Sequence, residues 1–326
     1  MAEDWFTIVL RLALYLDMAA AFGVAMFGVY ALGHDERSLA IARSYRICVG
    51  AFAAFGIGLS VVSMTVLAKA MSGAQTYAEL STHIFEMLIT GTHMGLAWCI
   101  RILALALCIL IALVKFNPTF RFVAMSASSG VALATLAWAG HGAMDDGMRG
   151  YVHLASDIFH LWAAGAWVGA LLAFLILATS RANATQDTVA ILSRTSNGFA
   201  HIGTLIVFVL AASGVVNYVL IAGPSLDPLV STLYGQLLLG KLVLVLGMLA
   251  LAAANRFRLS PSLEASLGSG NRAQAVAKLR QSLFMETTLA VLVLASVAWL
   301  GILSPKGICS SEINHRQQKR SCSKQT

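Results

Sequence analysis

The chain has 326 residues, of which 58% are hydrophobic and only 11% are charged, and its mean hydropathy is +0.78. This composition excludes an ordinary soluble domain, in which about a quarter of the residues are charged. Apolar runs of about 20 residues, the length that crosses a bilayer as a helix, recur along the chain. The sequence therefore predicts an all-α, polytopic membrane protein embedded in the lipid bilayer.

Eight hydrophobic runs predict eight transmembrane helices. They extend over residues 5–32, 45–71, 94–116, 120–140, 152–179, 199–222, 235–254 and 284–303. The first run is too long for a signal peptide and has no basic head, so we expect it to remain as an anchor. No connector has an alternating strand pattern, although 272–283 predicts a surface helix. Residues 1–305 are thus predicted to form a single integral membrane domain.

Basic residues lie on alternate connectors, which indicates the orientation of the chain. The connectors after the first, third, fifth and seventh spans hold twelve Lys or Arg residues, whereas the alternate connectors hold only Lys69 and Arg149. Basic loops stay in the cytoplasm, so an even number of spans places both termini outside. The net charge of +7 is then mostly a consequence of topology, and we expect no nucleic-acid surface.

The segment 306–326 departs from this charge rule. It is polar, of low complexity, and carries five Lys or Arg residues on the predicted outer face. Such a composition predicts disorder, either as an aberrant end of the chain or as a basic tail. Two of the five cysteines lie in this segment and three lie inside spans, where a thiol is usually a small hydrophobic group. No cysteine spacing indicates a zinc site.

The fifth predicted span carries three ionisable side chains on one face. His153, Asp157 and His160 stand at i, i+4 and i+7, within an arc of about 60°. With a rise of about 1.5 Å per residue, the row descends about 10 Å into the membrane, and Trp167 continues it. A carboxylate facing lipid would cost several kcal/mol, so Asp157 must face the bundle interior, pair with a cation or line a wet cavity. A structural Asp–His hydrogen bond and orientation of a metal-bound histidine are both open.

The connector before this span supplies further donors. His141, Met144 and Met148 stand beside Asp145 and Asp146. Imidazole and thioether together favour copper, especially Cu(I), because soft ligands suit a soft ion. Zinc more often recruits thiolates, and calcium or magnesium prefers oxygen ligands. The connector therefore predicts copper binding at the outer surface.

A second group of donors lies on the connector 72–93, which predicts a helix at the outer membrane interface. One face of this helix carries imidazole, thioether and hydroxyl groups at spacings of four, three and four. Its members are His83, Met87, Thr90 and Met94, flanked by Glu86 and His93. The alternative is an amphipathic interfacial helix whose polar side chains merely face water.

Other ionisable residues also occur inside the spans. They are Arg11, Asp17, Arg101, His201, Lys241 and Glu286. Arg11 and Asp17 are six residues apart and face different directions, so we do not expect them to pair. Arg101 lies near the outer surface and is the expected cation for Asp157 or Glu86.

Taken in order, several segments resemble the copper resistance protein D (CopD/PcoD) family of bacterial inner-membrane proteins. The resemblance extends over about residues 92–305. It rests on THMGLAWCIRILALAL from Thr92, GH at 140–141, HLASDIFHLWAAGAWVGAL from His153, SGVVNYVL, STLYGQLLLGKL, NRFRLSP and a last span that opens with Glu286. The resemblance implies passage of copper from periplasm to cytoplasm, alongside a periplasmic copper-binding partner of the CopC type. It assigns no task to individual residues.

The sequence thus predicts a multi-pass inner-membrane protein that transports copper, expected as Cu(I), and that is not an enzyme. The predicted ligands are His141, Met144, Met148, His153, Asp157, His160, His83, Met87, His93 and Met94. We expect the outer His and Met groups to capture copper and the fifth span to pass it inward. Conduction favours a chain of two- or three-ligand sites over one closed cage. The inner connectors hold no comparable cluster of His, Met or Cys, so the sequence does not indicate where copper would leave toward the cytoplasm.

Two other functions remain open at this point. In the first, His153, His160 or His201 would ligate a b-type haem, which requires two histidines that face each other from different spans. In the second, a copper sensor or membrane partner would use the outer ligands without a path for the ion. No P-loop is present to couple ATP hydrolysis to transport.

Overall fold

The computed structural model describes residues 2–139, 147–179, 186–224, 227–269 and 271–301, and within these ranges every regular element is helical. The α-helices are α1 (Ala2–Tyr30), α2 (Ala40–Ser72), α3 (Thr82–Gly91), α4 (His93–Leu113), α5 (Pro118–Ala134), α6 (Gly147–Thr179), α7 (Gln186–Ala222), α8 (Asp227–Ser231), α9 (Leu233–Ala254), α10 (Ser260–Ser269) and α11 (Arg272–Leu300). The segment 306–326 lies outside the described residues. The prediction of an all-α membrane bundle is confirmed.

Eight helices of the described part are long and apolar enough to cross a membrane: α1, α2, α4, α5, α6, α7, α9 and α11. They match the eight predicted spans in order. Several begin earlier than predicted, because hydropathy detects only the apolar part of a helix that continues into polar residues. The predicted surface helix 272–283 was wrong as a separate element. It forms the first turns of α11, where Val276, Leu279 and Leu283 are buried.

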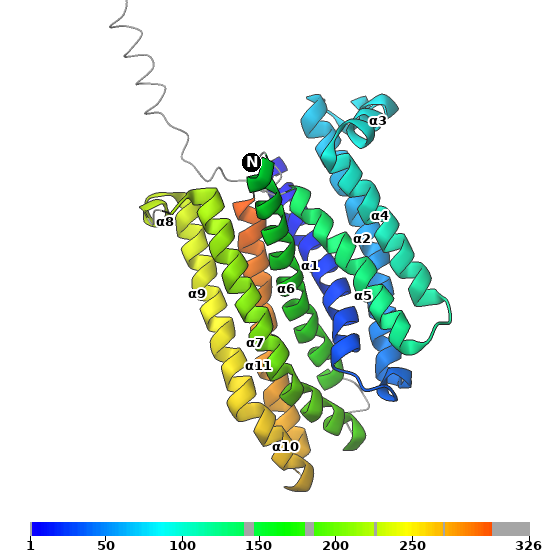
Figure 1. The fold of residues 1–326 in the computed structure, drawn as a ribbon, viewed down its shortest axis with the longest axis vertical. Coiled ribbons are helices and arrows are strands. Elements are labelled where there is room, and N and C mark those ends of the chain that lie inside the picture. The colour runs from blue at the N-terminus through cyan, green and yellow to red at the C-terminus, as the bar shows by residue number, and fades with distance from the viewer. Residues whose placement is uncertain (1, 140–146, 180–185, 225–226, 270, 302–326) are drawn as a thin grey trace, which may run out of the picture.

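The helices surround α1 and α6 (Figure 1). On one side, α2 and α5 pack against α1 and α4 packs against both. On the other side, α7 packs against α6, and α9 packs against α11. The short helices α3 and α8 lie at one end of the bundle, here called the α3 end, and α10 lies at the opposite end, the α10 end (Figure 1).

Glycines bring α1 and α6 into backbone contact. A Cβ built on Gly23 of α1 would lie 2.6 Å from the Cα of Gly169 in α6, closer than real Cβ atoms approach. A Cβ on Gly23 would also overlap the carbonyl oxygen of Gly165, one turn earlier in α6. Small residues four apart allow such close packing in membranes, where dispersion rather than water exclusion holds helices together.

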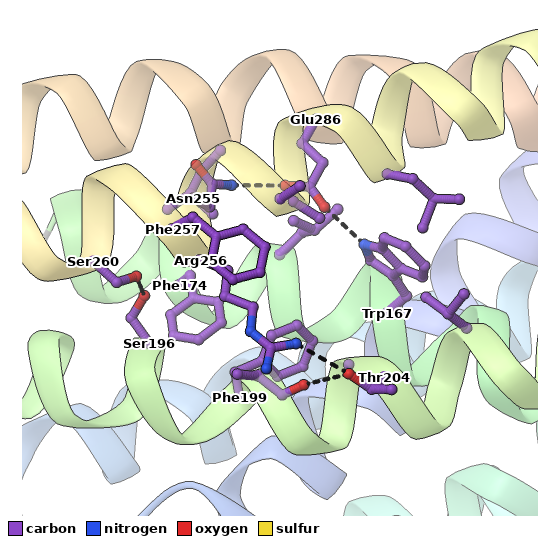
Figure 2. A pocket seen from close by; sticks show the side chains of 18 of the residues that line it. Trp167, Phe174, Ser196, Phe199, Thr204, Asn255, Arg256, Phe257, Ser260 and Glu286 are labelled. Carbon is purple, nitrogen blue, oxygen red and sulfur yellow. Dashed lines mark hydrogen bonds between the residues drawn. The ribbon is translucent and has the colours of Figure 1, made fainter.

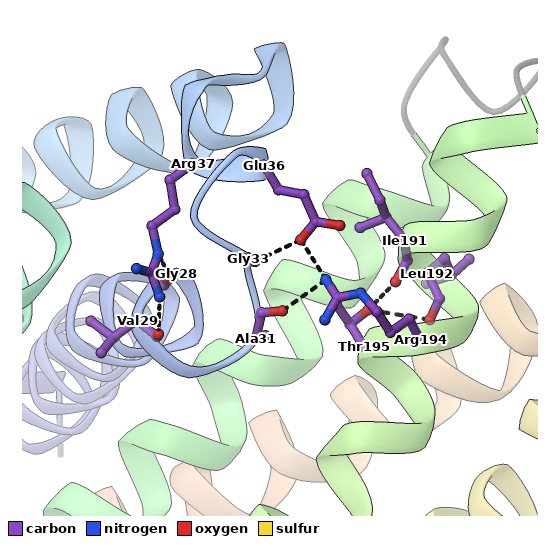
Figure 3. Close-up of polar contacts among 10 residues, drawn as sticks. All are labelled: Gly28, Val29, Ala31, Gly33, Glu36, Arg37, Ile191, Leu192, Arg194 and Thr195. Carbon is purple, nitrogen blue, oxygen red and sulfur yellow. Dashed lines mark hydrogen bonds and ion pairs between the residues drawn. The ribbon is translucent and has the colours of Figure 1, made fainter. Parts of the chain in front are cut away.

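Arginine side chains tie the end of α1 to other elements at the α10 end (Figure 3). Arg37 donates from Nε to the Gly28 carbonyl at 3.1 Å, and Arg194 of α7 donates to the Ala31 carbonyl at 3.1 Å. Arg194 also forms an ion pair with Glu36. Cations beside the last carbonyls of a helix compensate its negative end. These basic residues therefore stabilise the fold.

Substituting Gly169 with alanine should destabilise the bundle, because the new methyl group must push α1 away from α6. Overpacking of this kind typically costs about 1–3 kcal/mol. The measurement is the thermal unfolding midpoint of the purified protein in detergent. Gly240→Ala in α9 is the matched control, since a Cβ there meets nothing within 4 Å. Equal unfolding temperatures for the two variants would contradict the importance of the α1–α6 contact.

Candidate functional site

The predicted histidine and aspartate row lies on α6 and meets α7. Asp157 Oδ1 accepts a hydrogen bond from Asn217 Nδ2 at 2.7 Å, and His160 Nδ1 lies 2.9 Å from the hydroxyl of Ser213. His153 is buried, with its Nε2 at 4.0 Å from Asp157 Oδ2. Asp157 and His160 are therefore held by side chains of α7, and His153 is buried rather than exposed to lipid.

Asp157 and His160 line a cavity of about 200 Å³ toward the α3 end, called the first cavity. Side chains of α1, α6, α7, α9 and α11 surround it, among them Tyr15, Tyr234 and Lys241. A cavity that admits water satisfies one of the conditions under which an intramembrane carboxylate is tolerated. The row of α6 thus faces a polar cavity inside the bundle.

The cation beside Asp157 is not the one that the sequence suggested. Arg101 donates from Nε to the hydroxyl of Thr135 at 2.8 Å and is buried there. Lys241 of α9 instead lines the first cavity together with Asp157. The sequence did not indicate Lys241 as a neighbour of Asp157, because the face that α9 turns toward α6 depends on how the helices pack and not on residue spacing within either helix.

A second cavity, of about 250 Å³, lies toward the α10 end between α6, α7, the α9–α10 segment and α11 (Figure 2). Its walls are mostly apolar and aromatic, including Phe174 and Phe199. At one side Glu286 accepts hydrogen bonds from Trp167 Nε1 at 2.8 Å and from Asn255 Nδ2 at 2.9 Å (Figure 2). Glu286 is buried, so these two donors compensate a carboxylate inside the membrane.

One face of α6 contributes side chains to both cavities. Trp167 follows His160 by seven residues, which corresponds to about 10 Å along the same face. The sequence placed Trp167 on this face and Glu286 in the last span, but it gave no sign that the two meet. No His, Met or Cys is found among the described residues that line the second cavity.

The other predicted donors are distributed differently. His141 and Met144 lie outside the described residues, and Met148 is 77% exposed at the start of α6. His83 and Met87 are exposed on α3, which packs against α4 and α2 rather than α6 (Figure 1). Within the described part of the chain, the structure therefore does not bring the α3 donors to the α6 row. The remaining predicted donors, His93 and Met94, begin α4 beside α3.

The geometry of the described histidines does not match a haem held between α6 and α7. His160 faces Ser213, whereas His201 is exposed twelve residues earlier on α7, about 18 Å away along the helix. Among the described residues, no three His, Cys, Asp or Glu side chains gather to form a closed metal cage. The donors form open, partial sets.

Two family models match the chain. The copper resistance protein D-like N-terminal domain matches residues 1–151, and copper resistance protein D matches residues 193–300. The sequence is 46% identical over 305 residues to copper resistance protein D of Pseudomonas syringae pv. tomato, covering 93% of this chain and 98% of that protein.

More distant relatives are also membrane or copper proteins by name. Inner membrane protein YebZ of Escherichia coli (strain K12) is 29% identical over 81% of this chain and 87% of its own length. Copper transport protein CutJ of Bacillus subtilis (strain 168) is 27% identical over 74% of this chain and 44% of its own length. No solved structure matches the chain.

Replacing Trp167 with phenylalanine should cost more stability than the same change at Trp162. Trp167 donates to the Glu286 carboxylate, whereas Trp162 donates to the backbone carbonyl of Gly130 at 2.9 Å. Hydrogen bonds to charged groups contribute about 1.5–3 kcal/mol, and neutral ones about 0.5–1.5 kcal/mol. Denaturant unfolding of both variants measures the difference. Equal losses would show that Glu286 is not an ionised acceptor.

Proposed function

Because the chain belongs to the copper resistance protein D family, we propose that it carries copper from the periplasm to the cytoplasm across the bacterial inner membrane. The chain is a multi-pass inner-membrane protein. The observation that carries the proposal is the row His153, Asp157 and His160, which descends along α6 into the first cavity. The proposal includes no catalytic step.

The proposed orientation puts the α3 end in the periplasm. Arg37, Arg194 and Arg256 lie on the connectors or helix ends at the α10 end, in accord with the basic bias of cytoplasmic loops. Met148, exposed where α6 begins, and the segment containing His141 and Met144 would then face the periplasm. We propose that these groups receive copper, with a periplasmic CopC-type protein as its donor.

The α6 row supplies ligands of suitable type and spacing for inward passage. The bond between His160 Nδ1 and Ser213 leaves Nε2 of the ring to bind the ion, and a partner on the other ring nitrogen fixes its orientation. Asp157, held by Asn217, compensates the positive charge of the ion. Each set has few donors, so copper binds and leaves again, as conduction requires.

The second cavity provides an exit that the sequence did not predict. Copper leaving His160 would follow the α6 face to Trp167 and reach the carboxylate of Glu286. Since the described lining of this cavity has no thioether, thiol or imidazole, Cu(I) is held weakly there and is released readily. An acceptor with soft ligands in the cytoplasm would then take the ion.

A transport assay tests this function. Proteoliposomes loaded with a Cu(I)-chelating reporter should take up copper with the wild-type protein, and His153→Ala/His160→Ala should lower the initial rate at least tenfold. The expectation follows because even groups that merely orient a metal ligand change affinity by about 10–100-fold. His201→Ala is the matched control, since His201 is exposed on α7 away from both residues, and it should leave uptake unchanged.

The same samples separate the competing functions. Wild-type protein that incorporates in the membrane but takes up no copper would contradict transport and favour a sensor. A haem Soret band in the purified protein would favour a redox protein. Uptake that survives the double substitution would contradict a path along α6.

A further inference from the structure

The N-terminal half of the bundle contains a buried carboxylate that the α6 route does not use. Asp17 lies in the middle of α1 and is 3% exposed. Within the described part of the chain, neither of its oxygens has a hydrogen-bond partner. Asp157 and Glu286, by contrast, each accept hydrogen bonds from side chains. Asp17 is therefore the carboxylate whose burial the described residues leave uncompensated.

The nearby cations have other partners. Arg11, on the same helix, donates to the carbonyl of Gly301 at 2.6 Å. Arg101 of α4 donates to Thr135, and among the described residues no Lys or Arg lies within ion-pair distance of Asp17. An ionised carboxylate left alone in the membrane interior costs several kcal/mol. A bound cation would remove this cost.

Glycine at position 56 of α2 allows the side chains of Asp17 and Met18 to pack against the α2 backbone. A Cβ at Gly56 would overlap a carboxylate oxygen of Asp17 and would lie 2.8 Å from the Met18 methyl group. A carboxylate oxygen of Asp17 and the terminal methyl group of the Met18 thioether therefore both lie against the α2 backbone at Gly56. Ser60 donates to the Gly56 carbonyl at 2.7 Å, and Trp98 donates to the Ser60 carbonyl at 2.8 Å, which fixes this part of α2.

The face of α2 that contacts Asp17 continues along the helix toward α3. Gly56, Ser60 and Met64 follow one another every four residues and are all buried. Met64 packs in a cluster with Leu88 of α3. The exposed imidazole and thioether groups of α3, which the α6 route leaves unused, therefore lie at the α3 end of the same helices that enclose Asp17 (Figure 1).

We propose that Asp17 and Met18 form a second copper site, in the N-terminal half of the bundle and separate from the α6 row. A carboxylate and a thioether suit a singly charged soft cation, because the first supplies charge and the second supplies a soft donor. Calcium and magnesium would require more oxygen ligands than the Asp17 carboxylate offers. The inference rests on the proposed function only for the identity of the ion.

Copper binding to the purified full-length protein tests this site directly. The parent is His153→Ala/His160→Ala, in which both histidines of the α6 row are replaced. It is reconstituted in nanodiscs and titrated anaerobically with Cu(I) against a chromogenic chelator. We expect bound copper in this parent, and a loss of at least tenfold in its affinity on adding Asp17→Asn or Met18→Leu. Met248→Leu, a buried methionine of α9, is the matched control and should change nothing.

Two further readouts keep the outcome decisive. X-ray absorption at the copper edge should show a sulfur neighbour that Met18→Leu removes and Met248→Leu retains. If Asp17→Asn does not fold, the volume-conserving Met18→Leu still tests the site. Unchanged copper affinity in a folded Asp17→Asn or Met18→Leu variant would overturn the proposal. If the His variants lose uptake but Asp17→Asn leaves copper affinity unchanged, the Asp17 site is refuted and transport is not. If copper binding depends on Asp17 but the wild-type protein shows no uptake, transport is refuted and the Asp17 site is not.

Discussion

The backbone contact between α1 and α6 is the constraint on which the rest of the structure depends. Lipid tails are as apolar as leucine, so helices in a bilayer gain little from hiding apolar surface and associate through close packing. Gly23, Gly165 and Gly169 allow that packing at the centre of the bundle. The position of α1 then fixes α2 and α5 on one side, and the position of α6 fixes α7 on the other. Each polar site uses one helix of this central pair.

The polar groups of the bundle differ in how their burial is compensated. On α6, Asp157 and His160 have partners on α7, and Glu286 has two donors. These groups are held in place whether or not an ion is present. Asp17 has no such partner among the described residues, although α1 is the most central helix. The α6 row consists of groups that already have hydrogen-bond partners, whereas the proposed Asp17 site contains a carboxylate without one. We therefore expect the two to retain a bound ion for different times.

The sequence predicted what depends on local periodicity and missed what depends on helix packing. Run length and hydropathy identified all eight spans, and a period of 3.6 residues placed His153, Asp157 and His160 on one face. Spacing within a helix cannot show which helix that face meets, so Arg101 was chosen as a counter-ion in place of Lys241. The meeting of Trp167 with Glu286, and the position of α3 beside α4 rather than α6, were hidden for the same reason.

Lys241 gives the first cavity a property that a bare carboxylate would lack. Lys241 lines the same cavity as Asp157, so an ammonium group there would compete with a copper ion for one negative charge. This competition lowers the affinity of the site for copper and favours release, which a conducting path needs as much as capture. Asp17, by contrast, lines neither of the two cavities and has no lysine or arginine within ion-pair distance in the described part of the chain, and Asp157 also lacks a Lys or Arg at that distance. By this argument the α6 row suits passage of the ion, and the Asp17 site suits its retention.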